Sequence, residues 1–303
     1  MAMNAALDAV VCLLLVSAAV FGLVSVEQSP PQNPGQADAV ADALATTTAQ
    51  VPYSLAPGVR ALDDADPRSG NAAETPLDSP ELDRTAHGSL AGLLARAATG
   101  TAGVTLDSAD SDPEAVPLTR TRADFRRAVQ EAVRARTGAT ARIDAVWRPY
   151  PDAPVGGAVG VGPRPPTAGV HTATLVVPTG VAPIAASESA DFEALGRAVA
   201  DRTVRVLLPP GPAHVTLRGD DPAAGLVRYR YARIEAETNT SLSVPLATED
   251  TDAANARVAD ALAPQVTADL RNRYDTPAAA AESVSASSVR IVVRTWNPSA
   301  EAR

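Results

Sequence analysis

A run of twenty apolar residues near the N-terminus constrains this chain more than any other feature of its sequence. Residues 7–26 read LDAVVCLLLVSAAVFGLVSV, and Asp8 is the only charged residue among them. As a helix the run would be about 30 Å long, which matches the hydrocarbon core of a bilayer. No comparable run recurs along the chain. We therefore expect one large body held at the cell membrane by a single transmembrane helix.

The length of the run favours a retained anchor over a cleaved signal peptide. A signal peptide has a basic segment before a core of about 7–15 apolar residues, whereas this run is longer and no lysine or arginine precedes it. Small residues at positions 17–19 keep a cleaved signal as the alternative. No basic residue follows the run before Arg60, so the positive-inside rule predicts an extracellular body.

The composition excludes several chemistries. A net charge of −9 argues against a nucleic-acid partner, which would need a basic surface. A single cysteine permits neither an intrachain disulfide nor a cysteine-based zinc site. All 26 basic residues are arginine, which excludes a P-loop lysine and a Schiff base. We expect no cofactor and no metal, and as partners we expect the lipid bilayer and other membrane or surface-assembly proteins.

Hydrophobic periodicity predicts an α+β fold. We divide the chain into an anchor (1–29), a juxtamembrane helix with an acidic loop (30–84) and a soluble domain (85–303). The expected helices are 36–51, 87–99, 121–137, 187–208, 220–238, 250–274 (interrupted at Pro264) and 277–283. The expected strands are 103–106, 141–148, 170–177, 214–217 and 289–296, with 53–58 extended and loops at 60–84, 107–118 and 149–169. The main elements follow the order of a ferredoxin-like split βαβ fold, an antiparallel sheet with helices on one face.

Two arginine-rich segments are candidate interaction surfaces. The first is a patch on an otherwise acidic protein, which could meet anionic lipids or an acidic partner; its residues are Arg120, Arg122, Arg126, Arg127, Arg134 and Arg136. Its alternative is an ordinary solvated helix face. The second segment is RYRYAR at residues 228–233. Arginine and tyrosine are enriched at interface centres, although on a helix their stems also cover a core.

No motif predicts a catalytic residue. His87, His171 and His214 are isolated in the sequence and show no metal-ligand spacing. The glycine-rich stretch at 156–162 lacks the spacing of a dinucleotide-binding loop, so we expect a hairpin tip there, with a partner-docking loop as the alternative. Asn239 begins the sequon Asn-Thr-Ser and is a candidate glycosylation site.

Several segments resemble an uncharacterised haloarchaeal family of single-pass membrane proteins. The resemblance covers nearly the whole chain and is carried by residues 7–23, 44–58, 87–98, 141–154 and 289–298. Members of that family look to be encoded beside type IV pilus-like and secretion assembly components. The resemblance implies a place in the cell but no mechanism. The chain lacks the basic and small residues that mark prepilin cleavage ahead of the apolar segment.

Three functional hypotheses follow from these observations. The preferred one is a non-enzymatic accessory or minor pilin-like component of a surface assembly. The second is a membrane-tethered domain that binds or senses a ligand. The third is a tethered hydrolase, which would require His171 or His214 to line a pocket beside a carboxylate and a hydroxyl.

Overall fold

The computed structural model describes residues 35–65, 76–105, 115–117, 122–219 and 222–297. The chain from Gln36 onward forms one compact unit. The expected anchor at residues 7–26 lies outside the described residues. Within the described part, no helix is both long and apolar enough to cross a membrane.

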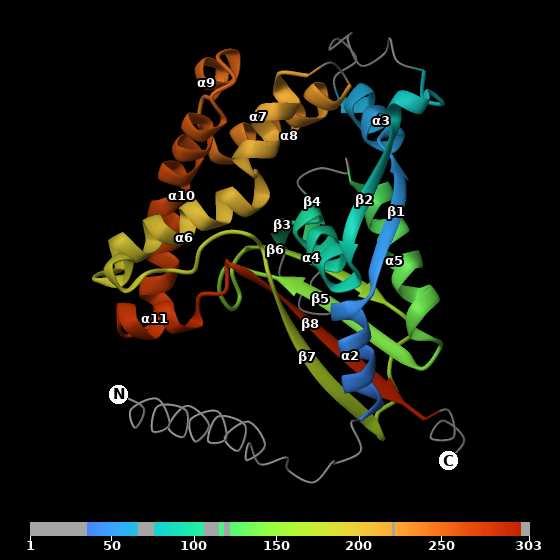
Figure 1. Cartoon of the computed structure of the whole chain (residues 1–303). Coiled ribbons are helices and arrows are strands. Elements are labelled where there is room, and N and C mark those ends of the chain that lie inside the picture. Colours follow the sequence, from blue (N-terminus) through green and yellow to red (C-terminus); the bar gives the residue numbers. More distant parts are fainter. Residues whose placement is uncertain (1–34, 66–75, 106–114, 118–121, 220–221, 298–303) are drawn as a thin grey trace, which may run out of the picture. The chain divides into compact units, whose positions relative to one another are not determined.

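Helices and strands alternate irregularly along the chain, as Figure 1 shows, and the fold is α+β as predicted. The helices are α2 (Gln36–Thr46), α3 (Ala56–Ala65), α4 (Leu90–Gly100), α5 (Ala123–Thr137), α6 (Phe192–Leu207), α7 (Pro210–Leu217), α8 (Ala223–Thr238), α9 (Ser243–Ala247), α10 (Thr251–Arg273) and α11 (Pro277–Ser283). Short 3-10 turns are η1 (Pro80–Leu82) and η2 (Ala186–Ser189). The strands are β1 (Thr48–Ser54), β2 (Asp83–Ser89), β3 (Gly103–Thr105), β4 (Ala115–Pro117), β5 (Ala141–Trp147), β6 (Val155–Val161), β7 (Val170–Pro178) and β8 (Ser288–Trp296).

Six of the strands form one antiparallel sheet in the order β4-β3-β6-β5-β8-β7. On one face, alternate residues such as Ile143, Trp147 and Ile291 are fully buried under α2, α4 and α5. On the other face, Arg142 and Arg294 both bond to Asp144 at partly exposed positions. This pattern is typical of an antiparallel sheet covered on one side.

The ferredoxin-like topology is wrong. That fold would place the strand at 103–106 between the strands at 289–296 and 170–177, whereas β8 pairs with β5 and β7, and β3 pairs with β6. The physical reason is β6, a strand that periodicity did not reveal. It forms a hairpin with β5 and pairs with β3 along its other edge, so β3 joins the sheet beside β6 while β7 and β8 pair directly with each other.

Strand β6 is built from the glycine-rich stretch, which was wrongly predicted to be a hairpin tip within a loop at 149–169. Its glycines make room for neighbours instead of bending the chain. A Cβ on Gly157 would overlap the carbonyl oxygen of Ala98 in α4, and a Cβ on Gly160 would overlap the guanidinium of Arg142 in β5. Glycine in a strand often marks such a close approach.

Other errors lie at element boundaries. Residues 214–217 are helical because Pro210 begins α7, a position that proline favours, instead of isolating a strand. Ser89 accepts a hydrogen bond from Gly92 N and so starts α4 at Leu90, which leaves His87 in β2. The helix expected at 36–51 ends at Thr46, and β1 follows. The piece at 53–58, expected to be extended, supplies the end of β1 and the start of α3. The loop expected at 60–84 contains the rest of α3 and the start of β2.

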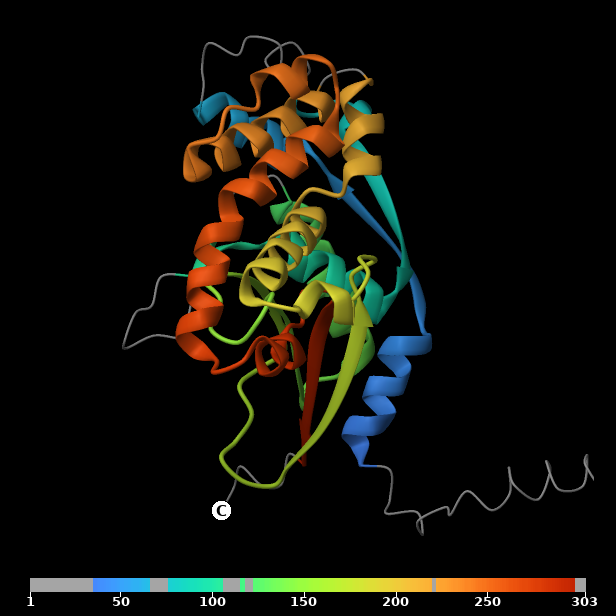
Figure 2. The same ribbon diagram turned by 90° about the vertical axis from the view of Figure 1, so that its left-hand side faces the viewer.

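Helices α6 to α10 form a second core, in which α6 and α10 pack against each other (Figure 2). A Cβ on Gly196 of α6 would overlap the side chain of Thr267 in α10, so this glycine sets their close crossing. A buried polar link joins α8 to α10: Tyr231 donates to Asn255 Oδ1 at 2.9 Å, and Asn255 Nδ2 donates to the carbonyl of Leu208 at 2.7 Å.

The two-stranded ribbon of β1 and β2 connects the two cores. Its register pairs Val51 with Ala86, and both side chains are buried against the sheet-side core. At the other end of the ribbon, η1 and α3 pack on α8 through Leu82, Val59 and Leu226. The boundary that we drew between residues 84 and 85 therefore falls inside β2.

Candidate functional site: an arginine pocket

A pocket of about 400 Å³ opens where β2, α4, α5 and α8 come together, and we call it the arginine pocket. Four arginines line it: Arg84 from β2, Arg96 from α4, Arg122 at the start of α5 and Arg230 from α8. The other lining residues are apolar or uncharged and include Tyr53, Phe125, Leu226 and Val227. None of the described lining residues is acidic.

Arg122 and Arg230 are half-buried and carry an electrostatic cost. Burial, and secondarily the charge of Arg122, lowers the pKa of Arg230. Burial also lowers the pKa of Arg122, and the charge of Arg96 lowers it further. Guanidinium groups keep their proton in proteins. The lowered pKa values therefore express a free-energy penalty on three positive charges held close together.

Two backbone features hold these arginines in the pocket. Gly100, in the last turn of α4, leaves space for Arg122, because a Cβ there would lie 3.0 Å from Arg122 Cδ. Arg84 Nη1 donates to the carbonyl oxygens of Glu81 and Asp83, at 2.6 and 2.8 Å. Carbonyl oxygens orient a guanidinium without cancelling its charge.

An aromatic pair forms part of the wall. The rings of Tyr53 and Phe125 meet edge to face with centroids 5.1 Å apart, and the guanidinium of Arg96 lies 5.4 Å from the Phe125 centroid. The acid closest in sequence to Arg122 is engaged elsewhere. Asp124 accepts a hydrogen bond from Ser54 N at 2.7 Å and a second from Arg127. Burial alone would raise the pKa of Asp124, but these two hydrogen bonds lower it overall.

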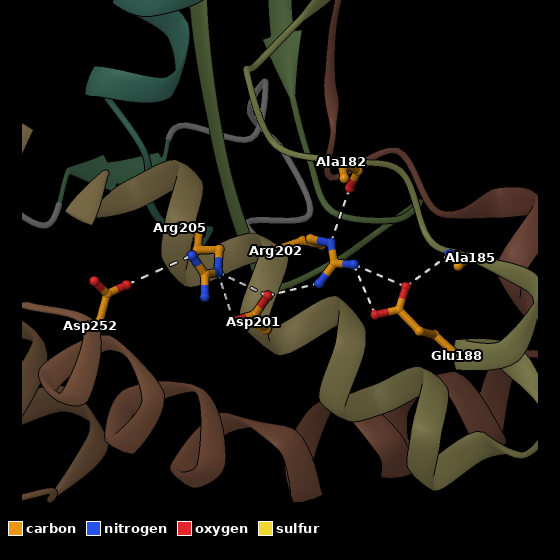
Figure 3. A network of polar contacts seen from close by, with 7 residues as sticks. All are labelled: Ala182, Ala185, Glu188, Asp201, Arg202, Arg205 and Asp252. Atoms are coloured by element: carbon orange, nitrogen blue, oxygen red, sulfur yellow. Dashed lines mark hydrogen bonds and ion pairs between the residues drawn. The ribbon is translucent and has the colours of Figure 1, made fainter. Parts of the chain in front are cut away.

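Arg202, on α6, shows how this chain neutralises an arginine that serves the fold (Figure 3). Its guanidinium bonds both carboxylate oxygens of Glu188 at 2.9 Å, Asp201 at 2.8 Å and the carbonyl of Ala182 at 3.0 Å. Glu188 also accepts from Ala185 N, and Asp201 in turn holds Arg205. Every charge in this network has an opposite partner. In the described part of the chain, Arg122 and Arg230 have no comparable partner.

The structure divides the predicted arginine patch. Arg122 enters the pocket, whereas the side chains of Arg126, Arg134 and Arg136 are exposed on α5. Arg127 is also exposed and pairs with Asp124 and Glu131. Arg120 lies outside the described residues. From the second segment, 228–233, Arg230 joins Arg122, so each arginine-rich segment contributes one member to the pocket.

The other candidate residues lie elsewhere. His87 and His171 are exposed on β2 and β7, and His214 bonds through Nδ1 to the carbonyl of Glu249 at 2.9 Å. None of the three lines the arginine pocket. Asn239 is exposed and ends α8 in a left-handed conformation, with φ 51°. Within the described residues, no cluster of three or more histidine, cysteine or acidic side chains could hold a metal ion.

Sequence reasoning missed Arg84 and Arg96. Arg96 is the only charged residue of α4, and the rest of that helix is apolar or small. This isolated charge was the one local signal that Arg96 has a particular role. Arg84 lies in a segment that we expected to be a loop. Their convergence depends on the β1–β2 ribbon packing against α4 and α5, which no local pattern encodes.

The structure is thus an α+β domain with a pocket lined by four arginines. Residues 7–296 match the family described as a family of unknown function, DUF7284, and the chain belongs to that family. The resemblance to an uncharacterised family is thereby confirmed. No curated protein and no solved structure gives a match.

Proposed function

We propose that this protein is a membrane-tethered binding domain whose arginine pocket recognises an anionic ligand. The observation that carries the proposal is the convergence of Arg84, Arg96, Arg122 and Arg230 on one pocket whose described lining contains no acid. Clustered guanidinium groups are suited to carboxylate and phosphate groups, which they bind through paired hydrogen bonds. A bound anion would offset the penalty that burial and mutual repulsion place on Arg122 and Arg230.

Binding fits this pocket better than catalysis. General acid–base or nucleophilic chemistry needs a group that can exchange a proton or attack a substrate, most often histidine, a carboxylate or cysteine. The described lining residues provide none of these, and their polar groups are guanidiniums, threonine hydroxyls and the Tyr53 phenol. We therefore propose that the protein is not an enzyme.

The test is the unfolding temperature of the full chain in neutral detergent, with chloride replaced at equal ionic strength by phosphate or citrate. A ligand at 100 times its Kd stabilises the native state by about 2.7 kcal/mol. We expect at least one of the two anions to raise the unfolding temperature of the wild type. The same increase should occur in Arg134→Gln, the control variant, which loses one positive charge on the exposed side of α5. The increase should disappear in Arg122→Gln and Arg230→Gln. An equal increase in all four proteins would refute the pocket as the binding site.

The proposal also includes the membrane anchor and the location of the protein in the cell. In this proposal residues 7–26 span the membrane and place the body outside the cell. We also propose a haloarchaeal origin beside pilus-like components, for which the resemblance in sequence is the support. Protease treatment of intact cells, followed by mass spectrometry of the released peptides, tests the location. Peptides from the body should appear without cell lysis. Their release only after lysis would reject the extracellular location.

A second candidate function is that of an accessory or minor pilin-like component of a surface assembly. The open face of the large sheet supports it, because Val146 and Val176 are 39% and 68% exposed there. A photo-crosslinking residue at Val176 should capture an assembly protein in intact membranes. Val215 on α7, which is 71% exposed, is the matched control. Identical adducts from both positions, or none from Val176, would reject this function.

A further inference from the structure

We infer that the arginine pocket is built for a phosphorylated organic ligand, in preference to a carboxylate. The inference rests on the proposed anion-binding function and specifies its ligand class. Three features of the pocket carry it: the number of elements that supply the arginines, the density of positive charge, and the volume beside an apolar wall.

The first feature is the separate origin of the four guanidiniums. Arg84, Arg96 and Arg230 come from β2, α4 and α8, and Arg122 precedes α5. A carboxylate offers two oxygens in one plane, and a single arginine can occupy both. A phosphoryl group offers three acceptor oxygens arranged around a tetrahedral centre. A tetrahedral group can therefore accept donors from several elements at once.

The second feature is charge. Arg122 lies close enough to lower the pKa of Arg230, and Arg96 acts on Arg122 in the same way. One carboxylate contributes a single negative charge to this group. A phosphoryl group contributes about −1.5 to −2 at neutral pH, which balances the repulsion more completely.

The third feature is the room beside the arginines. A volume of about 400 Å³ falls within the range of small-molecule sites and exceeds what an inorganic ion needs. Phe125 and Tyr53 form one apolar wall, and Leu226 and Val227 contribute another. The organic part of a phosphate ester would lie against these side chains. Such an ester could be a soluble metabolite or the headgroup of a lipid, and both present the same phosphoryl chemistry.

Calorimetric titration of the detergent-solubilised full chain tests the inference. The probes are phenyl phosphate and benzoate, which share a ring and differ in the anionic group, at constant ionic strength. We expect phenyl phosphate to bind at least about tenfold more tightly than benzoate. Arg122→Gln and Arg230→Gln should each weaken phenyl phosphate binding by about tenfold or more, whereas Arg134→Gln should not change it.

Two further variants separate geometry from folding. Arg122→Lys keeps the charge but loses the planar fork, so it should still weaken phenyl phosphate binding. Gly100→Ala keeps every charge and displaces Arg122, so it should weaken phenyl phosphate binding while circular dichroism shows a folded protein. Unchanged affinity in both variants would overturn the role assigned to the guanidinium geometry.

A short-chain phosphatidic acid, added as competitor, distinguishes the two sources of phosphate. An apparent Kd for phosphatidic acid, from its displacement of phenyl phosphate, that lies below the Kd of phenyl phosphate itself would indicate a lipid headgroup. The reverse order would indicate a soluble ester. Benzoate binding as tightly as phenyl phosphate, with the same dependence on Arg122 and Arg230, would overturn the phosphate inference and leave the anion-binding function intact. Absence of any anion binding that depends on these arginines would overturn both.

Discussion

Tyr231 donates a buried hydrogen bond of 2.9 Å to Asn255, and this bond anchors α8 at the residue next to Arg230, which lines the pocket. Tyr231 is fully buried, and burial, followed by the charge of Asp252, raises the pKa of its phenol. The phenol therefore stays neutral and acts as a donor. The side-chain amide of Asn255 in turn donates a hydrogen bond to the carbonyl of Leu208 at the end of α6.

Tyr231→Phe should lower the free energy of unfolding by about 1–3 kcal/mol, because it leaves the buried Asn255 Oδ1 without its donor. Urea denaturation measures the effect. Tyr229→Phe, on the same helix and with no tyrosine hydrogen bond seen in the described structure, is the matched control and should change stability by less than about 0.5 kcal/mol. Equal effects of the two variants would show that the Tyr231–Asn255 bond is not the stabilising contact.

Arg202→Gln should destabilise the protein far more than Arg197→Gln, although both arginines lie on α6. The Arg202 side chain is 16% exposed and bonds Glu188 through two oxygens, whereas Arg197 is 59% exposed and pairs with Glu193 one turn away. Loss of a partly buried bidentate pair costs about 1.5–3 kcal/mol, whereas an exposed pair one turn apart contributes about 0.3–0.5 kcal/mol. Chemical denaturation of the two variants side by side compares these costs.

Arg122→Gln and Arg230→Gln should stabilise the protein, in contrast to Arg202→Gln, when the buffer has low ionic strength and contains no binding anion. Each removes a desolvated charge that repels another, so the free energy of unfolding should rise by about 0.5–2 kcal/mol. The gain should shrink on addition of phosphate, which stabilises only the wild type. A loss of stability in both variants without anion would mean that these guanidiniums have partners within the fold.

Gly157→Ala should be among the most damaging single substitutions in the chain, because the added methyl group would overlap the carbonyl oxygen of Ala98. We expect a loss of about 3 kcal/mol or more, as for other overpacked or strained sites. Gly211→Ala is the control: open space surrounds Gly211, and alanine favours the helix. It should be neutral or stabilising in the same thermal unfolding measurement.

Asp124→Asn should destabilise the protein at neutral pH and not at strongly acidic pH. The pKa of Asp124 is lowered below its ordinary value of 3.8 in the native state. A carboxylate of this kind contributes stability above its unfolded pKa and loses it as the pH falls through the lower native pKa. The difference from wild type, about 1.5–3 kcal/mol at pH 7, should therefore vanish below that native pKa. A difference independent of pH would attribute the effect to packing.

The sequence predicted those elements in which local pattern and tertiary role agree. In β5, Ile143 and Trp147 alternate with Arg142 and Asp144, and the strand has one buried and one open face. In α5, Phe125, Val129 and Val133 form the expected buried stripe. Both elements pack by a single face, which leaves a readable period in the chain.

Prediction from the sequence failed where a residue's type is required by a contact with a segment distant in the sequence. The glycines of β6 are required by the backbone of α4 and by the side chains of β5, so their local pattern resembles a loop. The segment at 214–217 was expected to be a strand, but it is the last part of α7, which Pro210 begins. Likewise, Arg122 and Arg230 each belong to a visible arginine-rich segment, but nothing within either segment indicates that they meet. That relation depends on the tertiary arrangement that brings α8 to the same pocket as α4 and the start of α5.

The pocket draws on both cores, with Phe125 belonging to the sheet-side core and Val227 packing against the helical one. A ligand that contacts both walls of the pocket would couple the local unfolding of the two cores. Amide protons in α8 and in β1 should then slow their exchange with deuterated water to the same extent when the site fills. Ligand binding in such a domain would make the two cores open together, whereas without ligand each core would fluctuate separately.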